Sequence, residues 1–140
     1  QMSAVGRQRS KLRAWRTFRD GRAYVDNRLQ DVEFALRSQG ASRAFAMLTS
    51  HYLGLRGVGE TTASYYLFFR CLSAELPPGP SFAYPMTPSA IETLRRNGYA
   101  IDNSIRNPEV KYDAYLQAIL ELSEKTNQQP IEISCALNTR

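Results

Sequence analysis

The sequence is poor in the residues that build metal sites and disulfide frameworks. Its 140 residues include two cysteines, Cys71 and Cys135, and a single histidine, His51. Two cysteines are too few for a disulfide framework, and we expect neither a metal nor another cofactor. Each cysteine lies in an apolar stretch, which indicates small buried thiols in a reducing compartment. The same scarcity leaves no Ser/His/Asp or Cys/His arrangement for nucleophilic catalysis.

Long apolar segments are missing as well. No run approaches the roughly 18 residues of a membrane span, and the N-terminus has no apolar secretory core. We therefore expect a single soluble, cytoplasmic domain over residues 1–140, without a membrane partner. A chain of this length can bury about two-thirds of the surface that it exposes when unfolded.

The net charge of +5 is concentrated near the N-terminus. Residues 1–43 hold ten basic and four acidic side chains, whereas the rest of the chain holds eight basic and nine acidic ones. A basic segment of this kind is typical of polyanion binding, most simply nucleic acid. We expect residues 1–22 to form a basic arm or helix in which Arg9, Arg13 and Arg16 contact DNA. The alternative is a solvated helical arm that binds nothing.

Apolar residues at helical spacing predict an all-α, compact multi-helix domain. The expected helices cover about residues 7–19, 23–38, 43–53, 60–73, 88–97 and 108–124, with a short one from residue 130. The dense aromatic run at residues 65–69 suggests that its helix is central and buried on most sides.

Local signals mark the ends of several of these helices. Gly40 should stop the helix over residues 23–38, and Ser42 should cap the next one. Thr87 and Asn107 each precede a proline, which is typical of a helix start. The proline-rich residues 76–81 must form a loop.

The most informative stretch is Leu55-Arg56-Gly57-Val58-Gly59, between two predicted helices. Two glycines permit a sharp turn, because glycine reaches positive φ at little steric cost. The first N–H groups of the helix that follows have no intrahelical partner and attract an anion, such as a nucleic-acid phosphate. We therefore predict DNA contacts for a set of hairpin residues, the alternative being an αα-hairpin without a ligand. They are Arg56, Gly57, Val58, Gly59, Thr61 and Thr62.

This hairpin resembles the helix-hairpin-helix DNA-binding motif, which would span residues 43–73. The order of elements over about residues 40–137 is similar to that of the helix-hairpin-helix DNA glycosylase superfamily, particularly its 8-oxoguanine-glycosylase-like members. The resemblance implies an all-α fold and recognition of a damaged base after nucleotide flipping. It also implies a catalytic aspartate after the loop that follows the hairpin and, in bifunctional members, a lysine nucleophile in or just after the hairpin.

The chain departs from this family at both catalytic positions. The lysine would fall at Thr61, or at Tyr65 under a shifted alignment, and neither side chain forms a Schiff base. The aspartate would fall near Thr87, which supplies no carboxylate to balance developing positive charge. Neither an acid nor a lysine occurs between Glu75 and Glu92.

Other residues could carry the missing chemistry. Glu60 opens the helix after the hairpin, where its charge is favourable without any catalytic role. Asp102 lies in a predicted loop, where a turn or cap role is the simpler reading. Lys111 and Asp113 open the helix over residues 108–124 and could reach a loop pocket, although we expect them to be solvated.

Three functional hypotheses follow. The first is a protein that binds duplex DNA through phosphate contacts, with a glycosylase-like fold but without the usual chemistry. The second is a divergent DNA glycosylase or lyase that uses Asp102 or Glu60. The third is a helical module that binds a protein partner through an apolar patch on residues 60–73 or 108–124.

Overall fold

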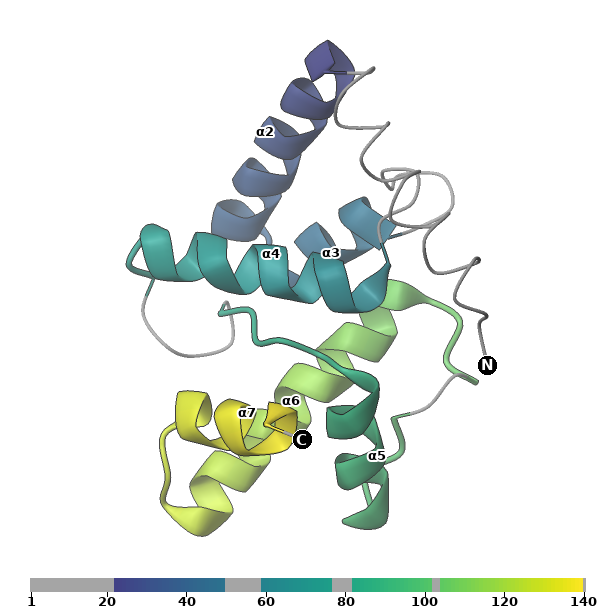
Figure 1. Cartoon of the computed structure of the whole chain (residues 1–140), viewed down its shortest axis with the longest axis vertical. Helices are drawn as coiled ribbons and strands as arrows, with labels where there is room; N and C mark the ends of the chain where they lie inside the picture. Colours follow the sequence, from purple (N-terminus) through teal and green to yellow (C-terminus); the bar gives the residue numbers. More distant parts are fainter. Residues whose placement is uncertain (1–21, 50–58, 77–81, 102–103, 140) are drawn as a thin grey trace.

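The computed structural model describes residues 22–49, 59–76, 82–101 and 104–139, and all regular structure within these ranges is helical (Figure 1). The helices are α2 (Arg22–Ser38), α3 (Ala41–Thr49), α4 (Glu60–Ser73), α5 (Pro88–Arg96), α6 (Pro108–Thr126) and α7 (Pro130–Asn138). The predicted all-α fold is therefore confirmed for the described residues. The predicted helix over residues 7–19 and the hairpin turn lie outside them. None of the described helices combines the length and apolarity needed to cross a bilayer.

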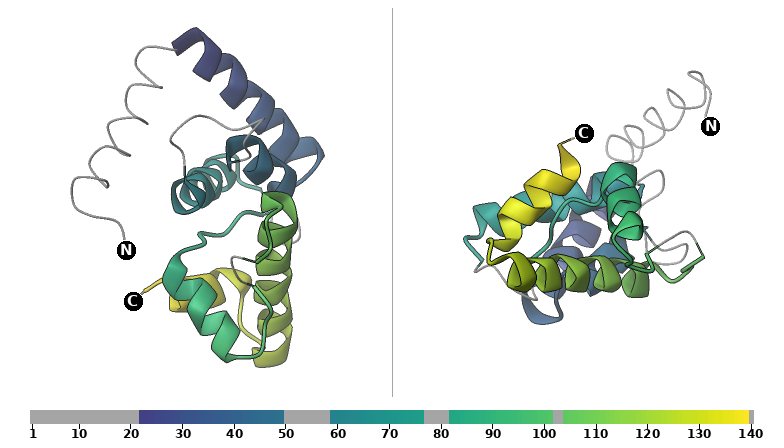
Figure 2. Two further views of the ribbon diagram at one scale, coloured as in Figure 1. Left: turned by 90° about the vertical axis from the view of Figure 1, so that its right-hand side faces the viewer. Right: turned by 90° about the horizontal axis from the view of Figure 1, so that it is seen from below.

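The helices form two groups that α6 connects. Figures 1 and 2 show α2, α3 and α4 at one end of the molecule and α5 and α7 at the other, with α6 running between them. α3 contacts α2, α4 and α6, whereas α7 contacts both α5 and α6. Aromatic stacking attaches the first group to α6, because the ring centroids of Phe45 in α3 and Tyr112 in α6 lie 4.2 Å apart. Burial of such rings makes a large contribution to the stability of a small domain.

Three predicted helix boundaries are confirmed. Gly40 ends α2 with a φ of +98°, and its N–H donates to the Ala35 carbonyl at 3.0 Å. The Thr87 hydroxyl caps α5 by accepting from the Ala90 N–H at 3.2 Å. The Asn107 side chain caps α6 by accepting from the Glu109 N–H at 3.0 Å. In α5 and α6 a proline follows the cap, at a position where its missing N–H costs nothing.

The predicted cap at Ser42 is wrong. α3 already begins at Ala41, and the Ala44 N–H donates to the Gly40 carbonyl at 3.3 Å. The chain therefore passes from α2 to α3 through Gly40, and Ser42 lies inside the first turn of α3. Its hydroxyl donates to the Asp113 carboxylate at 3.4 Å.

Two expectations about burial are also wrong. α4 buries one face only, because Phe69 and Leu72 are 58% and 44% exposed, while Ala63 and Leu67 are fully buried. Cys135 is exposed on α7, whereas Cys71 is buried as expected. Both errors come from reading an apolar stretch as buried all round, although a helix can bury such a stretch along one stripe.

A buried, non-helical segment, residues 82–86, lies between α4 and α5. Its backbone polar groups have no helical ladder, so other groups must satisfy them. Side chains from three helices do so. From α4, Cys71 Sγ accepts from the Ala83 N–H and Ser64 Oγ accepts from the Met86 N–H. From α6 and α7, Tyr112 donates to the Tyr84 carbonyl, and both Tyr115 and Asn138 donate to the Pro85 carbonyl. The segment is thereby attached to α4, α6 and α7.

We predict that Tyr112→Phe lowers the free energy of unfolding by about 1–3 kcal/mol, because it leaves the buried Tyr84 carbonyl without its 2.7 Å donor. Tyr84→Phe is the matched control, since the buried Tyr84 hydroxyl has no hydrogen-bond partner among the described residues. That control should be neutral or stabilising. Urea unfolding of both variants checks the prediction, and equal stability of the two would contradict it.

Candidate functional site

The N-terminus of α4 is exposed, and no described side chain caps it. Gly59 occupies the cap position with an extended backbone, φ −87° and ψ 173°, and its carbonyl accepts from the Ala63 N–H at 2.9 Å. Thr62 is exposed and Thr61 is half-buried. The first N–H groups of a helix carry partial positive charge when no cap covers them. This end of α4 can therefore accept an anion.

The other predicted DNA contacts lie outside the described residues. These are Arg56, Gly57 and Val58 of the hairpin and Arg9, Arg13 and Arg16 of the N-terminal arm, together with the alternative catalytic residue Asp102. Gly59 does not use the positive φ that glycine permits, since its φ is −87°. A Cβ atom built on Gly59 has no described atom within 4 Å. Glycine at this position supplies no side-chain cap for α4.

Glu60, the first residue of α4, forms an ion pair with Lys111 of α6. The Lys111 amine donates to the Glu60 carboxylate at 2.9 Å, and the two side chains are 5% and 41% exposed. The expectation that Lys111 is solvated is therefore wrong, whereas Asp113 is exposed as expected. A buried ammonium is costly without an opposite charge, and Glu60 supplies one. This pairing gives Glu60 a role that needs no catalysis.

A cavity of about 250 Å³ lies beside this ion pair. Its apolar wall consists of Met86, Pro88 and Ile91. Its charged residues come from three helices: Glu60 of α4, Glu92 and Arg95 of α5, and Lys111 of α6, with Thr61 also in the lining. The cavity thus combines apolar surface with ionic groups of both signs.

The contribution of α5 to this cavity is new relative to the sequence analysis. Four residues of α5 line it, and their i, i+3, i+4, i+7 spacing places them on one helix face: Pro88, Ile91, Glu92 and Arg95. The sequence therefore predicts that they share a face. It does not predict which helices that face lies against. Thr87 holds the start of α5, because its hydroxyl caps the helix and donates to the Asn138 side chain at 2.6 Å. Thr87, the residue near which the glycosylase resemblance would place an aspartate, therefore has a structural role.

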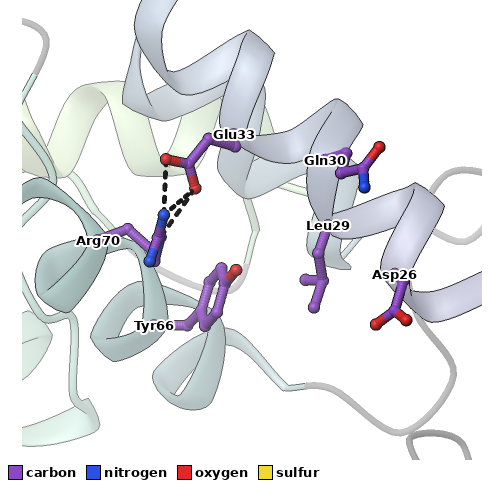
Figure 3. A pocket seen from close by; sticks show the side chains of 6 residues that line it. All are labelled: Asp26, Leu29, Gln30, Glu33, Tyr66 and Arg70. Atoms are coloured by element: carbon purple, nitrogen blue, oxygen red, sulfur yellow. Dashed lines mark hydrogen bonds and ion pairs between the residues drawn. The ribbon is translucent and has the colours of Figure 1, made fainter. Parts of the chain in front are cut away.

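A second, larger cavity of about 480 Å³ lies between α2 and α4, and Figure 3 shows its lining. The Arg70 guanidinium donates to both carboxylate oxygens of Glu33, at 2.8 and 2.7 Å, and this pairing lowers the pKa of Glu33. Arg37 also donates to Glu33, at 3.2 Å. Desolvation raises the pKa of Tyr66 in the same wall. Because both Glu33 oxygens are occupied by arginine, this cluster ties α2 to α4 and offers little to a ligand.

The described residues carry no excess of positive charge. They hold ten basic and eleven acidic side chains, so the basic excess of the chain belongs to residues outside the described ranges. Several of the described cations are also paired with acids: Arg43 with Glu109, Arg95 and Arg96 with Glu92, and Lys125 with Glu121. Within the described part of the chain, no group of three or more His, Cys, Asp or Glu side chains could hold a metal ion.

Comparisons of the chain with known protein families, with curated proteins and with solved structures found no match. The relation to helix-hairpin-helix glycosylases therefore depends on the sequence pattern and stays a prediction.

We predict that Gly59→Asn and Gly59→Asp both raise the free energy of unfolding by a few tenths of a kcal/mol, because each supplies the missing cap of α4. If this helix end binds phosphate, Gly59→Asp should also lower DNA affinity up to about fivefold more than Gly59→Asn, since it adds a negative charge there. Thermal unfolding and fluorescence anisotropy with a short duplex measure the two effects. Equal affinity of two folded variants would exclude this helix end as a phosphate site.

Proposed function

We propose that this chain is a DNA-binding protein with a helix-hairpin-helix, glycosylase-like layout that lacks the usual base-excision chemistry. One observation carries the proposal: the start of α4, which is exposed and receives no side-chain cap from the residues that the structure describes, directly follows the Leu-x-Gly-Val-Gly stretch. Phosphate oxygens would accept hydrogen bonds from the first N–H groups of α4 and from the hydroxyls of Thr61 and Thr62. Contacts of this kind position a protein on DNA without reading the base sequence.

Long-range attraction to DNA would come from another part of the chain. The described residues are slightly acidic in sum, so the start of α4 provides geometry rather than net charge. Arg9, Arg13, Arg16 and Arg56 would supply the sequence-independent electrostatic attraction. The proposed interface therefore has an attracting part and a positioning part.

The ionic contacts of the cavity support the absence of the family's chemistry. Its two acids are each paired with a cation, Glu60 with Lys111 and Glu92 with Arg95. Thr87 is engaged in capping α5 and offers no carboxylate. The alternative is a divergent glycosylase in which Asp102 or Glu60 supports excision of a damaged base. An assay of base release distinguishes the two.

A second candidate function is a protein-interaction module. It is favoured by the exposed Phe69 and Leu72 on α4, because this hypothesis predicts an apolar patch on that helix. Self-association of the chain without any affinity for DNA would support this candidate over the first.

The full chain should bind a short duplex with an affinity that falls steeply as salt increases. Replacing Arg9, Arg13 and Arg16 together with glutamine should lower the magnitude of the log–log salt slope by about 2.7, at roughly 0.9 per lost phosphate contact. Fluorescence anisotropy at several salt concentrations measures this slope. Absence of binding at low salt would refute the proposed function.

The matched control replaces Arg43, Arg95 and Arg96 with glutamine. This variant loses the same charge, but its arginines are exposed and paired with acids. Its salt slope should stay close to that of the unmodified chain. If both triple variants change the slope equally, net charge alone explains the effect and the arm makes no specific contacts.

We further predict that the chain releases no base from duplexes that contain oxidised or alkylated bases, because the family's aspartate and lysine positions hold threonine or tyrosine. Chromatography of the free bases after incubation measures release directly. Base release that disappears in Asp102→Asn or Glu60→Gln would instead establish the chain as a divergent glycosylase.

A further inference from the structure

The geometry points to the larger cavity, between α2 and α4, as the docking site of the N-terminal arm of the same chain. The occupant is the segment over residues 7–19, which lies outside the described residues and which the sequence predicts to be helical. Its apolar side chains, Leu12, Trp15 and Phe18, are those that would enter the cavity. This docking takes place within one chain and does not depend on the proposed DNA binding.

The position of α2 in the fold is the first argument. Among the described helices α2 packs mainly against α3, and its N-terminal half extends beyond both α3 and α4 (Figure 1). Asn27, Gln30 and Asp31 in this half are exposed. Most of the stability of a helix in a protein comes from packing of one face against the rest of the fold. A segment that packs along the projecting half of α2 would therefore stabilise it.

The surface inside the cavity suits apolar side chains. Leu29 of α2 and Tyr66 of α4 are partly buried and line it from opposite sides (Figure 3). The Glu33 carboxylate is already bound by Arg70 and Arg37, so an apolar side chain can cover this ion pair without leaving either charge unpaired. The volume of about 480 Å³ lies in the range that accepts drug-sized organic molecules, which gives room for an aromatic ring.

The arm joins the fold beside this cavity. Asp20-Gly21, a sequence typical of a turn, separates residues 7–19 from α2, which begins at Arg22. A helix over residues 7–19 would be about 20 Å long, so after a short connection it can run back along α2 as an αα-hairpin. The α2 residues that line the cavity share one face at i, i+3, i+4, i+7 spacing, starting about one turn after the helix begins: Asp26, Leu29, Gln30 and Glu33.

Charge favours the same occupant. The segment over residues 7–19 holds six basic side chains and no acidic one. The lining of the cavity holds two acids and one base, Asp26, Glu33 and Arg70, so its net charge is negative. The field of such a lining attracts a basic segment and repels a DNA strand, whichever partners the individual side chains hold.

Docking of the apolar face would also orient the arginines of the arm. Arg9, Arg13 and Arg16 follow i, i+4, i+7 spacing, so on a helix they share a face that differs from the face of Leu12, Trp15 and Phe18. With the apolar face in the cavity, the three arginines point away from α2 and stay accessible to a polyanion.

Trp15 provides the test, because it is the only tryptophan in the chain and its fluorescence reports the arm alone. In the full chain without DNA, Trp15 should emit at shorter wavelength, and acrylamide should quench it several-fold more slowly, than in the chain unfolded by urea. Equal quenching in the two states would overturn the inference. Protection that is lost on dilution would place the arm on a second copy and would also overturn docking within one chain. Because no DNA is present, these outcomes are independent of the proposed function.

Gln30→Arg tests whether the protection comes from this cavity. Gln30 is exposed and lines the cavity, so the substitution adds a positive charge facing the basic arm and removes little packing. Acrylamide should then quench Trp15 several-fold faster, whereas Gln30→Glu should keep the protection. Gln117→Arg is the matched control, because Gln117 is exposed on α6 and does not line the cavity. Equal quenching in the Gln30→Arg and Gln117→Arg proteins would contradict the inference.

A second pair of variants tests the arm itself. Leu12→Gln removes an apolar contact from the predicted docking face and should expose Trp15 to the quencher. Thr17→Gln, on the opposite face of the predicted helix, should leave its protection unchanged. The same quenching rate in both proteins would show that the arm does not dock through its apolar face.

Discussion

Residues 82–86 impose the main structural constraint on this protein, because they cross its interior without regular secondary structure. Water is excluded from this segment, and each of its backbone N–H and carbonyl groups therefore depends on a partner from elsewhere. Two tyrosine hydroxyls of α6 meet two of its carbonyls. Burial raises the pKa of both tyrosines, so their hydroxyls remain protonated donors across the ordinary pH range. The segment leads directly into α5 and thereby determines where α5 lies beside α4 and α6.

Two ion pairs within the described part of the chain differ in how firmly their acidic side chains are held. Glu33 is held by Arg70 through both carboxylate oxygens and also by Arg37, so its main role is to join α2 to α4. Glu60 accepts a hydrogen bond from Lys111 at one carboxylate oxygen and remains half-exposed, whereas the Lys111 side chain is buried.

Local sequence signals were sufficient to predict much of the helical layout. Thr87-Pro88 and Asn107-Pro108 mark helix starts because a cap hydrogen bond joins residues two or three positions apart. The prediction that Ser42 caps α3 was wrong for a reason that is also local. Gly40 ends α2 and leads directly into α3, so α3 begins before Ser42. Signals that involve only neighbouring residues can be read without knowing the fold.

The cavity could not be predicted in this way, because its ion pair joins residues 51 positions apart. A partial signal was present, since Lys111 lies four residues before Tyr115 and thus on the buried face of α6. A lysine on such a face indicates a buried stem and a nearby acid, but the sequence does not identify that acid as Glu60. The hydrogen bonds that attach residues 82–86 to α4 and α6 likewise join distant residues, and no local pattern encodes them.

The separation of charge along the chain constrains any model of DNA binding. The described residues are close to neutral, whereas the excess of positive charge lies in residues outside them, chiefly the N-terminal arm. Attraction by the arm would depend on salt and would be the same for every DNA of equal length. If the chain binds DNA, discrimination between DNA forms would then come from local geometry, such as that of the exposed start of α4. Affinity and selectivity in this protein would therefore respond to different residues, and salt should weaken the first much more than the second.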